Sequence, residues 1–201
     1  MSEHYFTARP ASPGETRTID VVLRGRPVQV RTAPGVFSGD RLDIGTRVLL
    51  DAVPDPAPTG TLVDLGCGWG PITLAMAAAS PAARVVAVDV NERARDLTAR
   101  NAAALGLGNV VATAPEEAGG LVADGIDELW SNPPIRIGKE ALHELLRTWL
   151  GRLAPAGHAR LVVSKNLGAD SLQRWVETEL GMPTERLSSS KGFRVLDVRR
   201  G

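Results

Sequence analysis

The stretch DLGCGWGP, residues 64–71, decides the fold of this chain. It follows a short apolar run at 61–65 and precedes a stretch with helical spacing at 72–79. Alternate glycines in a turn permit positive backbone φ angles and let the main chain pass close to a ligand. In sheets of parallel strands, ligands bind beyond the carboxyl ends of the strands, where such turns lie. We therefore expect a binding site at this turn.

Apolar runs of strand length alternate with helical stretches over the rest of the chain. The predicted strands are 61–65, 84–88, 110–113, 126–130 and 160–163, the predicted helices are 72–79, 92–105, 139–153 and 171–180, and the tail adds two antiparallel strands at 184–187 and 193–198. Strands that are apolar on both faces are typical of a parallel sheet covered by helices on both sides. The sequence thus predicts an α/β fold.

The segment ahead of this pattern predicts a smaller N-terminal unit. Apolar and polar residues alternate over 19–30, interrupted by a turn predicted at 25–27, which indicates a β-hairpin. An amphipathic helix is predicted over 45–52 and ends at a proline-rich run. We therefore predict an arm, this hairpin and a lead-in helix over 1–58, followed by the main domain over 59–201.

Composition excludes several classes of protein. The chain has 201 residues, 43% hydrophobic and 23% charged, which is typical of one globular domain and excludes a disordered or fibrous protein. We expect a cytoplasmic protein without a membrane partner, because no apolar run is long enough to span a bilayer and no secretory signal begins the sequence. The single cysteine forms no internal disulfide, and we expect no metal site. The 23 basic and 23 acidic residues leave binding to RNA open.

Two aspartates at successive strand ends indicate which kind of ligand binds. A dinucleotide fingerprint requires a small residue where this chain has Pro71, and Asp64 would repel a pyrophosphate. A nicotinamide oxidoreductase is therefore disfavoured. Asp89 ends the next strand, where a carboxylate can accept hydrogen bonds from both ribose hydroxyls. The pair favours a cationic ligand that carries a nucleoside.

The motif Ser131-Asn132-Pro133-Pro134-Ile135 follows another predicted strand. Two prolines fix the course of the chain and remove two backbone donors, so that carbonyl oxygens project above the sheet. The lone pair of an exocyclic base amine is delocalised into the ring, which makes the amine a poor nucleophile. Hydrogen bonds from this amine to the Asn132 side-chain oxygen and the Pro133 carbonyl would orient its lone pair toward an electrophile.

These motifs resemble a known family. Residues 64–70 with Asp89 resemble the cofactor-binding signature of class I S-adenosylmethionine-dependent methyltransferases, and Asn132-Pro133-Pro134 resembles the catalytic tetrad of members that methylate planar amino nitrogens. The stretch GVFSGDRLDIGT at 35–46 and the tail KGFRVL at 191–196 are similar to the ribosomal RNA guanine-N2 methyltransferases that act on the small subunit.

The resemblance implies a Rossmann-like sheet of seven strands with the last strand antiparallel, and helices on both faces. It implies S-adenosylmethionine as cofactor, S-adenosylhomocysteine as product, and RNA, either rRNA or the small ribosomal subunit, as partner. The implied cofactor-binding residues are Asp64, Gly66, Cys67, Gly68, Gly70, Asp89, Val90 and Asn132, and the implied catalytic residues are Asn132, Pro133, Pro134 and Ile135.

Some positions depart from the family's pattern. Ile135 stands where an aromatic side chain often stacks on the base, so stacking either comes from another residue or is replaced by apolar contact. The stacking candidates are Phe37, Phe193 and Trp69, and the candidates for contact with RNA are Arg136 and Lys191. The third strand ends without the usual acidic residue, for which Glu116 or Glu117 could substitute. The bacterial guanine-N2 enzymes carry two tandem domains, of which this chain resembles only the catalytic one.

The acceptor stays open at this point. The same tetrad would serve an adenine N6 amine or a protein glutamine side chain as well as guanine N2. A non-catalytic S-adenosylmethionine-binding factor for ribosome assembly is the alternative from another class of function.

Overall fold

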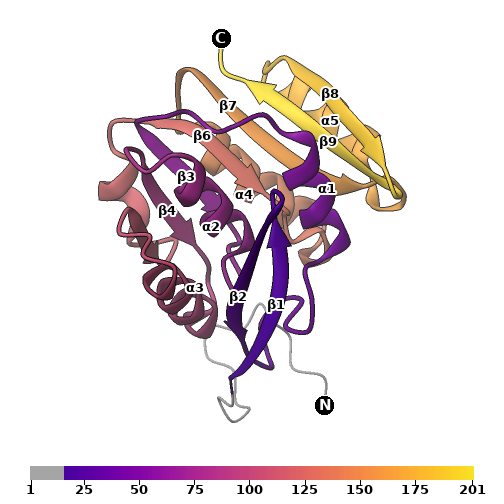
Figure 1. Cartoon of the computed structure of the whole chain (residues 1–201). Coiled ribbons are helices and arrows are strands. Elements are labelled where there is room, and N and C mark those ends of the chain that lie inside the picture. The colour runs from indigo at the N-terminus through magenta and orange to yellow at the C-terminus, as the bar shows by residue number, and fades with distance from the viewer. Residues whose placement is uncertain (1–15) are drawn as a thin grey trace.

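The computed structural model describes residues 16–201, so the arm predicted at the N-terminus lies almost wholly outside the described residues (Figure 1). The strands are β1 (Arg17–Leu23), β2 (Arg26–Thr32), β3 (Thr61–Leu65), β4 (Arg84–Val88), β5 (Val110–Thr113), β6 (Ile126–Ser131), β7 (Leu153–Ser164), β8 (Thr184–Ser190) and β9 (Phe193–Arg199). The α-helices are α1 (Ile44–Ala52), α2 (Pro71–Ala79), α3 (Glu92–Ala104), α4 (Lys139–Leu150) and α5 (Ala169–Glu179). Three short 3₁₀ helices complete the described part: η1 (Ala118–Val122), η2 (Ile135–Ile137) and η3 (Lys165–Leu167).

Seven of these strands form one sheet in the order β5-β4-β3-β6-β7-β9-β8. Strands β3 to β7 are paired in parallel, whereas β9 runs antiparallel to β7 and β8 runs antiparallel to β9. The expected mostly parallel sheet with an antiparallel last strand is therefore confirmed. The order reverses direction between β3 and β6, and ligands of such sheets bind at this switch point.

Helices cover both faces of the sheet, because its central strands are apolar on both sides. In β3, Leu62 faces a core formed with α1, α2 and α3, whereas the next residue, Val63, faces a core formed with α4 and α5. Both side chains are fully buried. This alternation along the strand is the pattern that a doubly covered parallel sheet requires.

The N-terminal hairpin turns one residue earlier than predicted. Arg24 and Gly25 form a two-residue turn with φ of 48° and 78°, and Arg26 and Pro27 already pair within the hairpin. Positive φ at both turn residues matches the twist of the paired strands. The Arg24 guanidinium donates hydrogen bonds to the Leu50 and Val53 carbonyls at the end of α1, at 3.1 and 3.0 Å, and so ties the hairpin turn to this helix.

The lead-in unit packs on the sheet through a shared core. Strand β1 lies against α2, β2 lies against α3, and α1 lies against β7 and β9 (Figure 1). The buried side chains of Val30 and Leu49 belong to the same core as Leu62. The predicted boundary after residue 58 stays a prediction.

The largest difference in boundaries concerns β7. Helical spacing is predicted to 153 and a strand over 160–163, but α4 ends at Leu150 and β7 begins at Leu153. Leu153 pairs with Ile126 of β6, and the pairing then shifts register between Ile126 and Glu128. An irregular strand of this kind lacks the regular period that sequence patterns detect. Within residues 16–201, no helix has the length and apolar character needed to cross a bilayer.

Candidate active site

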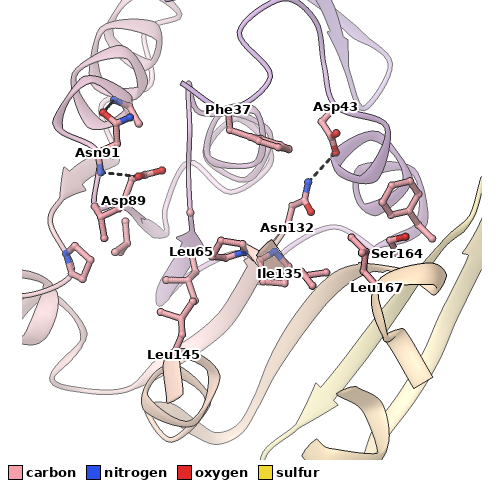
Figure 2. A pocket seen from close by; sticks show the side chains of 18 residues that line it. Phe37, Asp43, Leu65, Asp89, Asn91, Asn132, Ile135, Leu145, Ser164 and Leu167 are labelled. Atoms are coloured by element: carbon pink, nitrogen blue, oxygen red, sulfur yellow. Dashed lines mark hydrogen bonds between the residues drawn. The ribbon is translucent and has the colours of Figure 1, made fainter. Parts of the chain in front are cut away.

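A cavity of about 350 Å³ opens beyond the carboxyl ends of the parallel strands (Figure 2). Its lining includes Gly66 after β3, Asp89 after β4, Asn132 after β6 and Ser164 at the end of β7. Phe37 reaches the same cavity from the loop ahead of α1. The topology therefore gathers residues from five separate segments at the switch point of the sheet.

The glycine turn forms one wall. The amides of Gly66 and Cys67 donate hydrogen bonds to the Val88 carbonyl at 2.8 and 3.0 Å, which holds the turn against β4. Gly66 has a φ of 83° and is exposed to the cavity. Cys67 and Gly68 line a smaller adjoining cavity. Gly70 lines neither cavity but begins α2, where its φ of 99° and the 3.1 Å that would separate an added Cβ from Thr98 both require glycine.

Asp64 is buried behind this turn and does not line the cavity. Its Oδ2 accepts hydrogen bonds from the backbone amide and the hydroxyl of Thr73 in α2, at 2.9 and 2.6 Å. Its Oδ1 is buried and has no hydrogen-bond partner among the described residues. Burial raises the pKa of this carboxyl group to about 7, although the hydrogen bonds from Thr73 lower it.

The raised pKa predicts an unusual pH dependence of stability. Between pH 4 and about 7 the folded state keeps the Asp64 proton that the unfolded chain has lost, so the free energy of unfolding falls as pH rises. The Asp64→Asn variant lacks this slope, which amounts to at most about 1.4 kcal/mol per pH unit. Urea unfolding of both proteins at pH 5, 6, 7 and 8 measures the difference. Parallel pH profiles of the two proteins would contradict the assignment.

Asp89 lines the cavity next to the glycine turn and also fastens this turn. Its Oδ2 accepts a hydrogen bond from the Gly68 amide at 3.0 Å, and its Oδ1 accepts one from the Asn91 amide at 2.9 Å. Burial raises the pKa of Asp89, against the effect of these two bonds and of Arg95. The neighbouring Val90 also lines the cavity and is largely exposed. Each Asp89 oxygen retains a lone pair for a ligand.

The orientation of Asn132 is set by the lead-in segment. Its Nδ2 donates hydrogen bonds to Asp43 Oδ2 at 2.9 Å and to Thr46 Oγ1 at 3.1 Å. A carboxylate accepts hydrogen bonds and does not donate them, so the nitrogen must be the atom that faces Asp43. The Asn132 side-chain oxygen is consequently turned away from Asp43 (Figure 2). It remains available to accept a hydrogen bond in the cavity.

The two prolines continue this wall. Pro134 has φ −75° and ψ 70°, and the Ile135 amide donates a hydrogen bond to the Pro133 carbonyl at 2.8 Å, which together define an inverse γ-turn. The Pro133 carbonyl thus has one partner within the chain and one lone pair left. Pro133, Pro134 and Ile135 all line the cavity.

The structure separates the stacking candidates. Phe37 is 38% exposed and lines the cavity, and Phe193 of β9 lines it as a half-buried side chain. Trp69 is only 1% exposed, and its indole donates a hydrogen bond to the Ser38 carbonyl at 3.2 Å. Trp69 therefore belongs to the core and offers no face to a base.

Other predicted residues lie elsewhere. Lys191 is exposed in the turn between β8 and β9 and does not line the cavity. The backbone of Arg136 belongs to η2, but its side chain lies outside what the structure describes. Glu116 and Glu117 do not line the cavity, whereas their neighbour Pro115 does.

Several residues of the cavity were not singled out from the sequence. Asp43, Asn91, Ser164 and Leu167 line it from the lead-in loop, the start of α3, the end of β7 and η3. Asp43 lies within the stretch that carried the resemblance, but nothing local indicates that it meets a residue 89 positions away. The Asn91 side chain caps α3 and donates a hydrogen bond to the Gly35 carbonyl at 2.8 Å, which links the lead-in loop to the end of β4.

Comparison with known proteins identifies the family. Residues 27–197 match the family described as methyltransferase small domain. The chain belongs to this family. This methyltransferase is 31% identical to the Bacillus subtilis protein YbxB over 201 residues, which cover both chains completely. Membership confirms the predicted class, an S-adenosylmethionine-dependent methyltransferase.

Longer relatives share this domain. Ribosomal RNA small subunit methyltransferase C of Pseudomonas aeruginosa is 36% identical over 185 residues, which cover 86% of this methyltransferase and 51% of the relative. The solved structure of the T. thermophilus 16S rRNA N2 methyltransferase RsmC, in complex with AdoMet and guanosine, matches the fold with a TM-score of 0.78 and 24% identity, over 96% of this chain and 52% of that chain. The chain thus spans about half the length of these relatives.

The described residues fit S-adenosylmethionine. Asp89 lines the cavity and keeps acceptor lone pairs beyond its bonds to the Gly68 and Asn91 amides, which suits the ribose hydroxyls of the cofactor. An added Cβ at Gly66 would meet nothing within 4 Å, so the backbone of the turn is open to a ligand. The carboxyl group of Asp89 in the cavity wall also suits a ligand with a positive sulfonium.

Proposed function

We propose that this methyltransferase transfers a methyl group to an exocyclic amine of an RNA base, and that the amine is guanine N2 in rRNA of the small ribosomal subunit. The observation that carries this proposal is the orientation of Asn132, whose nitrogen is fastened to Asp43 and Thr46 and whose oxygen is left to accept a hydrogen bond. An amine with two hydrogens is the group that such an oxygen, next to the Pro133 carbonyl, would bind.

Different residues of the chain would bind the different parts of the cofactor. S-adenosylmethionine supplies the electrophilic methyl group on its sulfonium. Asp64 would act from behind the turn, which it ties to Thr73 of α2, and the backbone of the turn would pass along the methionine portion, with Gly66, Cys67 and Gly68 nearest to it and Gly70 setting the start of α2. Asp89 would accept from the ribose hydroxyls, and Val90 would cover the adenine as an apolar neighbour.

Asn132 and Pro133 would act on the acceptor by orientation. Two hydrogen bonds from the amine to these oxygens hold its plane and direct the lone pair toward the methyl group. Pro134 and Ile135 would shape the wall beside the base. Phe37 and Phe193 would supply aromatic faces on the same cavity, and Arg136 and Lys191 would contact RNA phosphates outside it.

The relatives support rRNA as the substrate class. The Pseudomonas aeruginosa relative, which is 36% identical to this chain, is named ribosomal RNA small subunit methyltransferase C. The T. thermophilus protein of similar fold is described as a 16S rRNA N2 methyltransferase in complex with guanosine. Because the chain spans about half of each, the way in which it recognises RNA belongs to the proposal as well.

The test is the identity of the methylated nucleoside. The purified protein is incubated with methyl-labelled S-adenosylmethionine and unmodified ribosomal RNA, free and within small subunits, and the RNA is digested to nucleosides. We expect label in N2-methylguanosine. Label in N6-methyladenosine would keep the chemistry and refute guanine as the acceptor, and absence of label despite cofactor binding would refute rRNA methylation.

A further inference from the structure

We infer that Asp43 is the residue that selects guanine over adenine, by accepting a hydrogen bond from guanine N1–H beside the amine held by Asn132. This inference rests on the proposed function and adds the source of its specificity. The two bases differ at this edge. In guanine the atom next to the exocyclic amine, N1, carries a hydrogen and donates, whereas the N1 next to the adenine amine accepts.

The two carboxylate oxygens of Asp43 have different surroundings. Its Oδ2 accepts hydrogen bonds from the Thr46 amide at 3.0 Å, as the N-cap of α1, and from Asn132 Nδ2 at 2.9 Å. Its Oδ1 has no hydrogen bond or ion pair within residues 16–201, although the side chain lines the cavity. One oxygen is therefore structural, and the other is an acceptor without a partner in residues 16–201, on a side chain that lines the cavity and contacts Asn132.

The surroundings keep this carboxylate in place. A Cβ added at Gly45 would lie 3.0 Å from Asp43 Oδ2 and 3.0 Å from a ring carbon of Phe193, so the chain packs closely on both sides of Gly45. The N-cap hydrogen bond fixes Asp43 to the first turn of α1. A carboxylate anchored in this way binds a base without a further loss of side-chain conformational entropy.

The other polar side chains of the cavity do not make this distinction. Asp89 and Asn91 lie at the end of β4 and the start of α3, where the Asp89 carboxylate accepts from the Asn91 and Gly68 amides and the Asn91 side chain donates to the Gly35 carbonyl. The hydroxyl of Ser164 both donates and accepts, so it accommodates either base. Asp43 is the side chain next to Asn132 that only accepts, and it would repel the N1 acceptor of adenine.

The Asp43→Asn variant separates recognition of guanine N1–H from the orientation of Asn132. Thr46 N–H and Asn132 Nδ2 both need an acceptor, so the new amide must place its oxygen where Oδ2 stands and its NH₂ group where Oδ1 stands. The helix cap and the orientation of Asn132 are preserved, while the group that faces the base changes from acceptor to donor. Asp51→Asn, on the exposed side of α1, is the matched control.

The experiment measures binding of nucleosides to the full chain saturated with S-adenosylhomocysteine, by calorimetric titration. The probes are guanosine and 2-aminopurine riboside, which keeps the 2-amino group but has an acceptor at N1. We expect wild-type protein and Asp51→Asn to prefer guanosine by about tenfold to hundredfold, the range for a charge-assisted hydrogen bond. In Asp43→Asn we expect that preference to vanish or reverse, with an unchanged melting temperature.

Two results would overturn the inference. One is a wild-type protein that does not prefer guanosine, a measurement that needs no variant. The other is an Asp43→Asn protein whose affinity falls equally for both nucleosides, which is the result expected if Asp43 has a purely structural role. Formation of N2-methylguanosine on rRNA together with either result would leave the proposed function standing and remove only the role of Asp43.

Discussion

Replacement of Asn132 by alanine is expected to lower the rate of methyl transfer by about a hundredfold to a thousandfold, the usual cost of removing one oriented polar contact at a reacting centre. The variant loses the oxygen that holds the acceptor amine, but it keeps the glycine turn and Asp89. The dissociation constant for S-adenosylmethionine should therefore change by less than about tenfold. Single-turnover transfer to ribosomal RNA and calorimetric titration of the cofactor measure the two effects separately.

A matched control is available in Asn166→Ala. Asn166 is an exposed asparagine of η3 and does not line the cavity, so its removal should leave both transfer and cofactor binding at the wild-type level. Transfer by Asn132→Ala at the wild-type rate would show that the acceptor amine is held by another group. Loss of cofactor binding together with transfer would instead make Asn132 a cofactor contact.

Replacement of Asp89 by alanine is expected to abolish tight binding of the cofactor. The variant lacks the proposed hydrogen bonds between the carboxylate and the ribose, each worth about 1.5–3 kcal/mol when charge-assisted. It also leaves the Gly68 and Asn91 amides without the acceptor that holds the turn and the start of α3 in place. Two ribose contacts alone correspond to a rise of about a hundredfold to ten-thousandfold in Kd. Titration of the cofactor into the variant measures this rise.

Asp96→Ala serves as the control for a lost aspartate charge outside the cavity lining. Asp96 is exposed on α3 and, within residues 16–201, pairs with Arg100 one helical turn away, an arrangement that contributes little to stability. Its replacement should leave cofactor binding unchanged. Asp89→Ala with a wild-type Kd would contradict the proposed ribose contact, and a lowered melting temperature without a change in Kd would assign Asp89 to the turn alone.

Much of the fold follows from local patterns in the sequence. The alternation of apolar strands with helical stretches predicts β3, β4, β5 and β6 within one residue of their observed bounds. It does so because each strand is apolar on both faces and each helix has its own period, which are properties of neighbouring residues. The predicted hairpin turn and the start of β7 were wrong by one and seven residues, at a two-residue turn and at an irregular strand where no regular period exists.

The candidate site divides in the same way. The glycine turn, Asp89 and Asn132 are visible in the sequence because each ends a predicted strand, and parallel strands bring their carboxyl ends to one edge. Tertiary packing buries Asp64 against Thr73 and places Trp69 in the core. No local sequence pattern predicts either of these positions.

The sequence by itself determined that the chain builds a doubly covered parallel sheet, and which turns lie at its ligand-binding edge. Only the tertiary structure decided what each side chain at that edge faces. Asp43 meets Asn132 across 89 residues because α1 lies against the sheet beside the end of β6, and this contact sets which atom of the Asn132 amide is free. Hydrogen-bond partners of this kind depend on the packing of distant elements, whereas strand and helix periods depend only on neighbours in the chain.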